Sequence, residues 1–112
     1  MKSDKFNEII EKRIALCKEV LINKSAEYAT EDRLHNFKVA AELQNCSDVR
    51  ALGGMMAKHT VSIYDLINDY DAGVETSVDM WDEKIGDHIN YLLLLTAMIY
   101  EKESEQTSVL NN

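Results

Sequence analysis

Glu83 and Asp87 are the two residues of this sequence whose types and spacing best suit the binding of a metal ion. They lie four positions apart, so on a helix their carboxylates project from neighbouring turns, and the amide of Asn90 continues the same row. Two carboxylates and an amide oxygen are hard ligands that suit Mg²⁺ or Mn²⁺. Because like charges at this spacing repel each other, a cation between them would remove an unfavourable interaction.

The same row is also where an ordinary solvated helix face would lie, because it is roughly opposite a stripe of apolar residues. Leu94 and Ala97 extend the row, so the face that begins acidic ends apolar, which indicates that part of it is covered. The spacing alone leaves both interpretations open.

A second group of candidate residues is cationic. Lys24, Arg33, His35 and Lys38 form the densest cluster of basic and potentially basic residues in the chain. With the ring of Tyr28 available for stacking, such a cluster suits a nucleotide that carries phosphates. A charged helix followed by a loop, with no ligand at all, would have the same composition.

His59 and His88 each fall in a stripe of apolar residues at helical spacing. A single histidine in such a stripe is commonly a core residue with a satisfied hydrogen bond, whereas two on helices that pack together can line a polar cavity. The sequence contains neither a Gly-x-Ser-x-Gly motif nor a Walker-type phosphate loop, so a serine nucleophile has no support. The two cysteines, Cys17 and Cys46, do not form a Cys-x-x-Cys pair and do not indicate a zinc site.

The elements that must position these residues are all predicted to be helical. The chain has no proline and only four glycines, and its apolar residues recur at helical spacing. We expect an all-α bundle of three long helices and one short one, at about residues 3–28, 32–44, 48–70 and 78–103. Ser47 is the expected N-cap of the third helix, and the segment 71–77 contains Gly73 and is expected to be a loop. At 112 residues we expect one domain, 1–103, followed by a polar and frayed tail, 104–112.

Each long helix carries a stripe of residues that we expect to be buried. The first stripe is Phe6, Ile9, Ile10, Ile14, Cys17, Val20 and Leu21; the third helix has Leu52, Met56, His59, Ile63, Leu66 and Tyr70; the last has Trp81, Ile85, His88, Leu92, Leu95 and Ile99. From Tyr91 to Tyr100 the last helix is apolar on nearly every side. Three neighbouring helices can hardly cover such a surface, so the bundle is expected to be completed by copies of the same chain. The pair Gly53-Gly54 is costly in a helix and indicates the close approach of a neighbouring backbone.

The overall charge and hydropathy narrow the range of partners. The formal net charge is −8, from 20 acidic and 12 basic residues, so nucleic acid would be repelled by most of the surface and is an unlikely general partner. The longest run of purely apolar residues, Leu92 to Leu95, is far shorter than a membrane span of about 20 residues. The N-terminus lacks the apolar core of a signal peptide, and we therefore expect a cytoplasmic protein without a membrane partner.

Three segments, in this order, resemble known helical proteins: Glu27-Tyr28 with His35-Asn36-Phe37, then Met55-Met56-Ala57-Lys58-His59, then Glu83 to Asp87 with Asn90-Tyr91. Together they are similar to the all-α NTP pyrophosphatases, the MazG-like and dUTPase-like group, and to nucleotide-modification-associated domains of phages. The resemblance spans about residues 24–100. In the stricter MazG pattern the late pair of carboxylates is three positions apart, whereas Glu83 and Asp87 are four apart.

The resemblance implies a helical bundle that assembles as a dimer or tetramer, in which acidic residues bind Mg²⁺ at a nucleoside triphosphate and a metal-activated water attacks phosphorus. Glu83 and Asp87 match the late acidic motif, and Glu27 is the nearest candidate for an early acidic ligand. The implied function is that of a Mg²⁺-dependent, nucleotide-binding phage protein or a pyrophosphohydrolase-like enzyme, in the host cytoplasm. The residues that would contact the nucleotide are Lys24, Tyr28, Arg33, His35, His59 and Asn90; no catalytic residue is assigned.

The alternative belongs to another class of function. The chain would then be a non-enzymatic, oligomeric phage accessory protein that binds another protein through its acidic surface. Acidic and basic residues alternate along much of the sequence, which argues against an acidic mimic of DNA.

Overall fold

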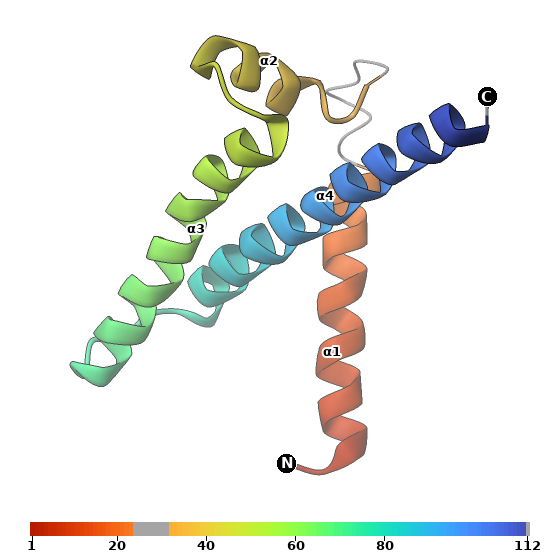
Figure 1. Cartoon of the computed structure of the whole chain (residues 1–112). Coiled ribbons are helices and arrows are strands. Elements are labelled where there is room, and N and C mark those ends of the chain that lie inside the picture. Colours follow the sequence, from red (N-terminus) through yellow and green to blue (C-terminus); the bar gives the residue numbers. More distant parts are fainter. Residues whose placement is uncertain (24–31, 112) are drawn as a thin grey trace. The chain divides into compact units, whose positions relative to one another are not determined.

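The computed structural model describes residues 1–23 and 32–111, and within these ranges every regular element is helical (Figure 1). The elements are the α-helix α1 (Ser3–Lys18), the π-helix η1 (Glu19–Asn23), and the α-helices α2 (His35–Gln44), α3 (Asp48–Asp71) and α4 (Val78–Asn111). The all-α prediction is confirmed. The chain divides into two compact units, residues 1–32 and 33–112. In the described ranges no helix is long and apolar enough to cross a membrane.

The first unit contains α1 and η1. α1 begins at Ser3 with Lys2 as its N-cap, and Asp4 in the first turn and Lys18 in the last turn each complement the helix dipole. The backbone then widens into the π-turn of η1. Cys17 is buried, but most of the apolar stripe of α1 is exposed, with Phe6 at 54% and Ile14 at 51%. The expected burial of that stripe is therefore wrong for the side chains described, and residues 24–28 of the predicted helix lie outside the described ranges.

Several helix ends in the second unit are explained by residues that cap them. α2 begins at His35, three residues later than expected, and ends at Gln44, and its C-cap Asn45 adopts the left-handed conformation with φ 53°. Ser47 then caps α3, because its Oγ accepts a hydrogen bond of 3.0 Å from the Arg50 N–H, as expected from the sequence. α3 is followed by Gly73, whose positive φ of 78° suits a glycine.

α4 begins after Ser77, whose Oγ accepts a hydrogen bond of 3.2 Å from the Met80 N–H. It was expected to end near Glu103, yet it continues to Asn111. The frayed tail that we predicted from residue 104 is therefore helical as far as 111. The segment after Glu103 contains no glycine or proline to stop the helix, which is the physical reason for the difference.

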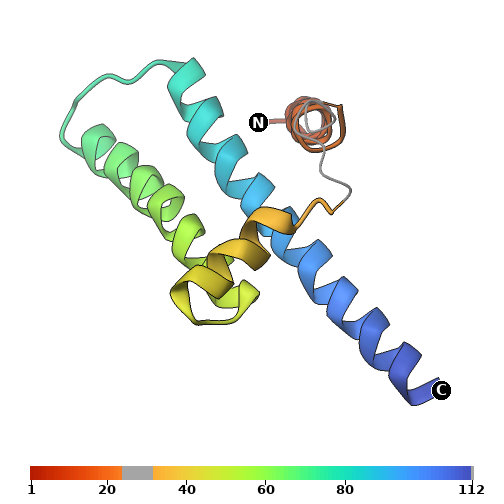
Figure 2. The same cartoon turned by 90° about the horizontal axis from the view of Figure 1, so that it is seen from above.

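The core of the second unit lies where α2 meets α3 and α4. α3 and α4 run antiparallel from the loop that joins them, and α2 lies across the opposite end of this pair (Figure 2). The fully or nearly buried side chains there are Leu34, Phe37, Leu52 and Met98, with Val49, Met55, Met56, Tyr91, Leu94 and Leu95 packed around them. Most of the predicted stripe of α3 faces inward, although Tyr70 at its end is 73% exposed.

The face of α4 that packs inward differs from the predicted stripe. Met98 is fully buried and Asn90 is 8% exposed, whereas Ile85, Leu92 and Ile99 are 36%, 46% and 47% exposed. The stripe prediction was wrong at these three residues. α4 is apolar on several sides, so hydrophobic spacing could not decide which side meets α2 and α3. The row of side chains that begins with Glu83 and Asp87 is the one that becomes buried, from Asn90 onwards.

Candidate functional site

A polar cluster lies between α3 and α4, at the edge of the core. His59 Nδ1 on α3 lies 3.9 Å from Asp87 Oδ2 on α4. The His59 ring also packs against the ring of Tyr91, with centroids 4.6 Å apart and planes tilted by 33°. Tyr91 in turn meets Phe37 of α2 edge to face, with centroids 6.3 Å apart. A carboxylate, an imidazole and a phenol ring are thus brought together by α3 and α4, and the ring of Phe37 on α2 packs against the phenol.

The sequence places these groups by helical spacing. His59 follows Leu52 and Met56 along the inward face of α3, and Asp87 and Tyr91 are four positions apart on α4. The side chain of His59 is 26% exposed and that of Asp87 is 43% exposed. The pair is therefore half-buried: a ligand can reach it from solvent, and the aromatic rings form its inner wall.

Asn90 is the buried polar residue of this region. Its side chain is 8% exposed, and its Oδ1 atom has no hydrogen-bond partner among the described residues. A buried acceptor without a partner costs about 1–3 kcal/mol. Asp87 precedes Asn90 by three positions, so the two side chains project from neighbouring turns of the same helix. An oxygen that lacks a partner beside a carboxylate is suited to a cation or to a hydrogen-bond donor.

Glu83 lies one turn before Asp87 and is exposed. Within residues 1–23 and 32–111, no three His, Cys, Asp or Glu side chains converge in a way that could hold a metal ion. Mg²⁺ differs from Zn²⁺ in this respect, because it commonly keeps several waters and binds one or two carboxylates together with the phosphates of a ligand. On the row of α4 that carries Glu83, Asp87 and Asn90, the first side chain is exposed, the second is half-buried and the oxygen of the third is buried. Glu27, the third metal ligand expected from the resemblance, lies outside the described residues.

The two histidines occupy different environments. Thr60 Oγ1 lies 3.1 Å from His88 Nε2 and donates a hydrogen bond of 3.4 Å to the carbonyl oxygen of Met56. Which of the two groups donates in the contact between Thr60 and His88 depends on the tautomer of the imidazole ring. His88 is therefore a structural histidine with a satisfied bond, and His59 is the one that faces a carboxylate.

The predicted cationic cluster is only partly described. Lys24 and Tyr28 lie outside the described ranges. Arg33 precedes α2 and is exposed, and His35 is an exposed residue in the first turn of α2. Lys38 forms an ion pair of 3.1 Å with Glu101 of α4, so its charge is offset within the chain.

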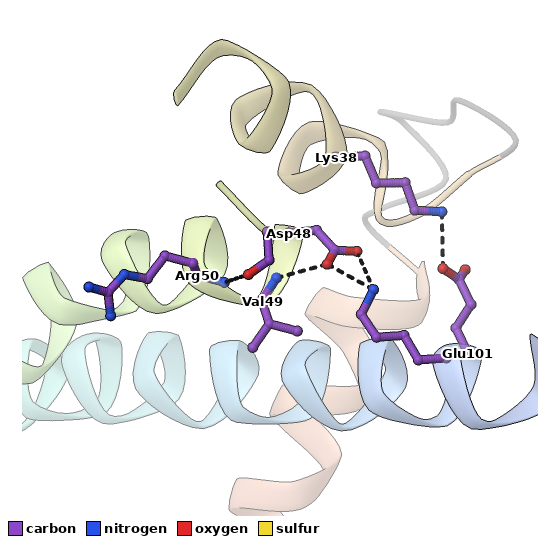
Figure 3. A network of polar contacts seen from close by, with 7 residues as sticks. Lys38, Asp48, Val49, Arg50 and Glu101 are labelled. Atoms are coloured by element: carbon purple, nitrogen blue, oxygen red, sulfur yellow. Dashed lines mark hydrogen bonds and ion pairs between the residues drawn. The ribbon is translucent and has the colours of Figure 1, made fainter. Parts of the chain in front are cut away.

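One polar contact that sequence reasoning missed fixes α4 against α3. Lys102 Nζ lies 2.8 Å from Asp48 Oδ1 and 3.0 Å from Asp48 Oδ2, and the Val49 N–H donates to the same carboxylate (Figure 3). The hydrogen bond from Lys102 lowers the pKa of Asp48 below its usual value, against the opposing effect of burial. The partners are 54 positions apart in sequence, so no local pattern could have revealed them.

The glycine pair Gly53-Gly54 does not have the role that the sequence suggested. A Cβ atom at either position would meet nothing within 4 Å among the described residues, so no neighbouring backbone approaches there. The two glycines border a shallow, open hollow at the start of α3, together with Gln44, Ser47, Val49 and Arg50.

A comparison of the chain with models of protein families, with curated proteins and with solved structures finds no match.

Proposed function

We propose that the chain binds a nucleotide together with Mg²⁺ at the half-buried surface formed by Asp87, His59 and Asn90. The observation that carries the proposal is the buried Oδ1 atom of Asn90, which has no partner among the described residues and follows two carboxylates on the same helix row. The resemblance of three sequence segments to the MazG-like group supports the same function independently.

The residues proposed to hold the cation are Glu83, Asp87 and Asn90, with Glu27 as a further ligand by resemblance. Bound there, Mg²⁺ would supply positive charge to offset the phosphate oxygens of the nucleotide. This role explains why two carboxylates sit on neighbouring turns of α4 in front of a buried amide oxygen.

Other residues of the chain are proposed to bind and orient the nucleotide. Asp87 orients the imidazole of His59 from one side and the ring of Tyr91 supports it from another. Lys24, Arg33 and His35 are proposed to contact phosphates, and Tyr28 to stack on the base. By resemblance, the reaction would be hydrolysis of the α–β phosphoanhydride of a nucleoside triphosphate in the cytoplasm of a phage host.

Self-association is part of the proposal. Leu92, Leu93, Ile99 and Tyr100 are 44–67% exposed along the outer side of α4. A series of exposed apolar side chains on one helix is favourable when another apolar surface covers it. We propose that a second copy of the chain does so, in a dimer or tetramer.

The test is a screen of canonical and modified nucleoside triphosphates with Mg²⁺ or Mn²⁺, read as pyrophosphate release and as a rise in Tm. The expected result is a rise in Tm with at least one nucleotide, which is lost in Asp87→Asn and kept in Asp79→Asn. Both substitutions remove one charge from α4, but Asp79 is exposed in its first turn, so it is a matched control. Neither pyrophosphate release nor a change in Tm with any nucleotide would contradict the proposal.

A further inference from the structure

His59 of α3 and Asp87 of α4 face each other across a gap that is too wide for a hydrogen bond. The Nδ1 and Oδ2 atoms are 3.9 Å apart, whereas a hydrogen bond between nitrogen and oxygen spans about 2.7–3.2 Å. Within the described part of the chain, neither side chain forms another hydrogen bond or ion pair. An imidazole and a carboxylate, both common metal ligands, are therefore held close together without a direct bond between them.

The orientation of the imidazole is fixed by aromatic packing. The ring of Tyr91 lies against the ring of His59, with centroids 4.6 Å apart, and Phe37 supports Tyr91 edge to face. Because Tyr91 covers a face of the imidazole, the ring edge that carries Nδ1 is left to Asp87. A ligand that is already held in place loses less conformational freedom when it binds.

The width of the gap suits a bridging ion. Two ligand atoms that each lie about 2.0–2.2 Å from a Zn²⁺ ion are about 3.4 Å apart at the tetrahedral angle. Starting from 3.9 Å, His59 and Asp87 need to approach each other by about 0.5 Å to bind the same ion. Both side chains are partly exposed, so they can make this movement and an ion can reach them from solvent.

The nitrogen ligand indicates which ions fit the gap. Mg²⁺ is bound in proteins by oxygen atoms, whereas imidazole suits Zn²⁺ and the related ions Fe²⁺, Co²⁺ and Ni²⁺. One imidazole and one carboxylate leave the other coordination positions of such an ion to water or to the oxygen atoms of a ligand. A pair of this kind is therefore an open site and not a closed structural one.

We propose that His59 Nδ1 and Asp87 Oδ2 bind one transition-metal ion between them, and that this site prefers Zn²⁺ to Mg²⁺. The inference rests on the proposed function, because it names the ion that Asp87 holds beside the nucleotide. It also makes His59 a ligand of that ion. With Nδ1 bound to the ion, the hydrogen of the neutral imidazole lies on Nε2, which can then donate to a phosphate oxygen.

The first test observes the histidine rings of the native chain directly. Zn²⁺ is added, without nucleotide, to protein that carries no affinity tag, and the ring nitrogens of His35, His59 and His88 are followed by long-range ¹H–¹⁵N NMR. We expect the Nδ1 signal of His59 to shift and the other two rings to stay unchanged, and we expect no shift with Mg²⁺ at the same concentration. Equal shifts of His35 and His59 would show adventitious binding, and no shift of His59 would show that it is not a ligand. Either result would overturn the proposal.

The second test measures the affinity for Zn²⁺ by isothermal titration calorimetry. His59→Gln and Asp87→Asn should each bind Zn²⁺ at least about tenfold more weakly than the native chain, because each removes a ligand. His88→Gln is the control and should change the affinity by less than about twofold, since its amide can still contact Thr60. Circular dichroism and Tm confirm that each variant is folded. Unchanged affinity in His59→Gln would contradict the proposal.

The two tests separate this inference from the proposed function. If Mg²⁺ and a nucleotide raise Tm but Zn²⁺ does not shift the His59 signal, the inference is wrong and the nucleotide-binding function stands. If Zn²⁺ binds to His59 and Asp87 but no nucleotide raises Tm, the metal site is supported and the nucleotide-binding function is wrong.

Discussion

At the scale of single residues, Asn90 has the least ordinary environment in the second unit. It lies on the inward side of α4, where Leu94 and Met98 follow it into the core, and its Oδ1 atom is buried without a partner among the described residues. An apolar residue of similar volume would avoid the cost of burying that oxygen. Binding of a cation or a hydrogen-bond donor to the Oδ1 atom would offset that cost, and this is the role that we propose for the asparagine.

Replacing Asn90 by leucine tests that account. We expect Asn90→Leu to raise the free energy of unfolding of the ligand-free protein by about 1–3 kcal/mol, because a buried oxygen without a partner is removed. The same variant should lose the rise in Tm caused by Mg²⁺ and nucleotide. Asn68→Leu, at an exposed position of α3, is the matched control and should change neither quantity appreciably. A large loss of stability in Asn90→Leu, measured by urea unfolding, would show that the amide has a structural role.

Residues of the candidate site could be predicted from the sequence where they lie close together on one helix, and not where they come together from different helices. Asp87 and Asn90 were found because they are close together on one helix, and their row was expected to be partly covered because Leu94 continues it. The contact of His59 with Asp87 could not be predicted, since it depends on how α3 and α4 are aligned. The same holds for Asp48 and Lys102, which no local spacing connects.

At the scale of the elements, local chemistry predicted the start of α3 and the loop that follows it, whereas hydrophobic spacing predicted most of the inward face of α3 and not that of α4. The Ser47 cap and the loop with Gly73 lie where local chemistry requires them. The inward face of α4 was predicted wrongly because the helix is apolar on several sides between Tyr91 and Tyr100. The helical spacing of its apolar residues is therefore compatible with more than one buried face. Its orientation depends on α2 and α3, which are distant in sequence.

A matched pair of substitutions tests the orientation of α4. Leu94→Ala is expected to lower the free energy of unfolding by about 2 kcal/mol, because Leu94 packs against the buried cluster. Leu92→Ala removes the same atoms from a side chain that is 46% exposed, and should cost less than about 1 kcal/mol in the monomer. Urea unfolding at low protein concentration measures both. A greater loss for Leu92 would mean that α4 is turned the other way.

The ion pair between Asp48 and Lys102 predicts a dependence of stability on pH. Because the folded state lowers the pKa of Asp48, the pair stabilises the protein above the unfolded pKa of about 3.9, and the contribution is lost as the pH falls through the lower folded value. Lys102→Met should therefore lower the free energy of unfolding by roughly 0.5–1 kcal/mol at neutral pH, and the difference from the native chain should shrink towards about pH 3. Lys58→Met, at an exposed position of α3, is the control. A difference that persists unchanged at acidic pH would contradict the assignment.

At the scale of the whole molecule, apolar side chains are exposed on α4 and on the second half of α3, and residues 60–83 of the α3–α4 hairpin contain seven acidic residues and no basic one. The outer side of α4 carries little charge between Leu92 and Tyr100 and suits a second copy, whereas the acidic hairpin disfavours one. The net charge of −8 alone does not show this division, because it is the sum of an acidic hairpin and of a remaining chain that is nearly neutral.

Self-association through α4 can be measured directly. If the chain forms the proposed oligomer, we expect Leu92→Ser with Ile99→Ser to shift it towards the monomer in sedimentation velocity, since both side chains are nearly half exposed on the outer side of α4. Tyr64→Ser with Tyr70→Ser, which removes two exposed rings from α3, should leave the oligomer unchanged. The assignment of self-association to α4 is wrong if the α3 variant dissociates the oligomer and the α4 variant does not.

The central claim is that a divalent cation binds with a nucleotide beside Asn90, and paramagnetic broadening by Mn²⁺ tests it most directly. In the amide NMR spectrum of the chain with a non-hydrolysable nucleoside triphosphate, trace Mn²⁺ should broaden the signals of Glu83, Asp87 and Asn90 first, including the side-chain amide of Asn90. Asp87→Asn should abolish this selective loss. Broadening centred on Asp69, Asp71 and Glu75 would instead show diffuse attraction to the acidic hairpin, and would contradict a metal site at Asn90.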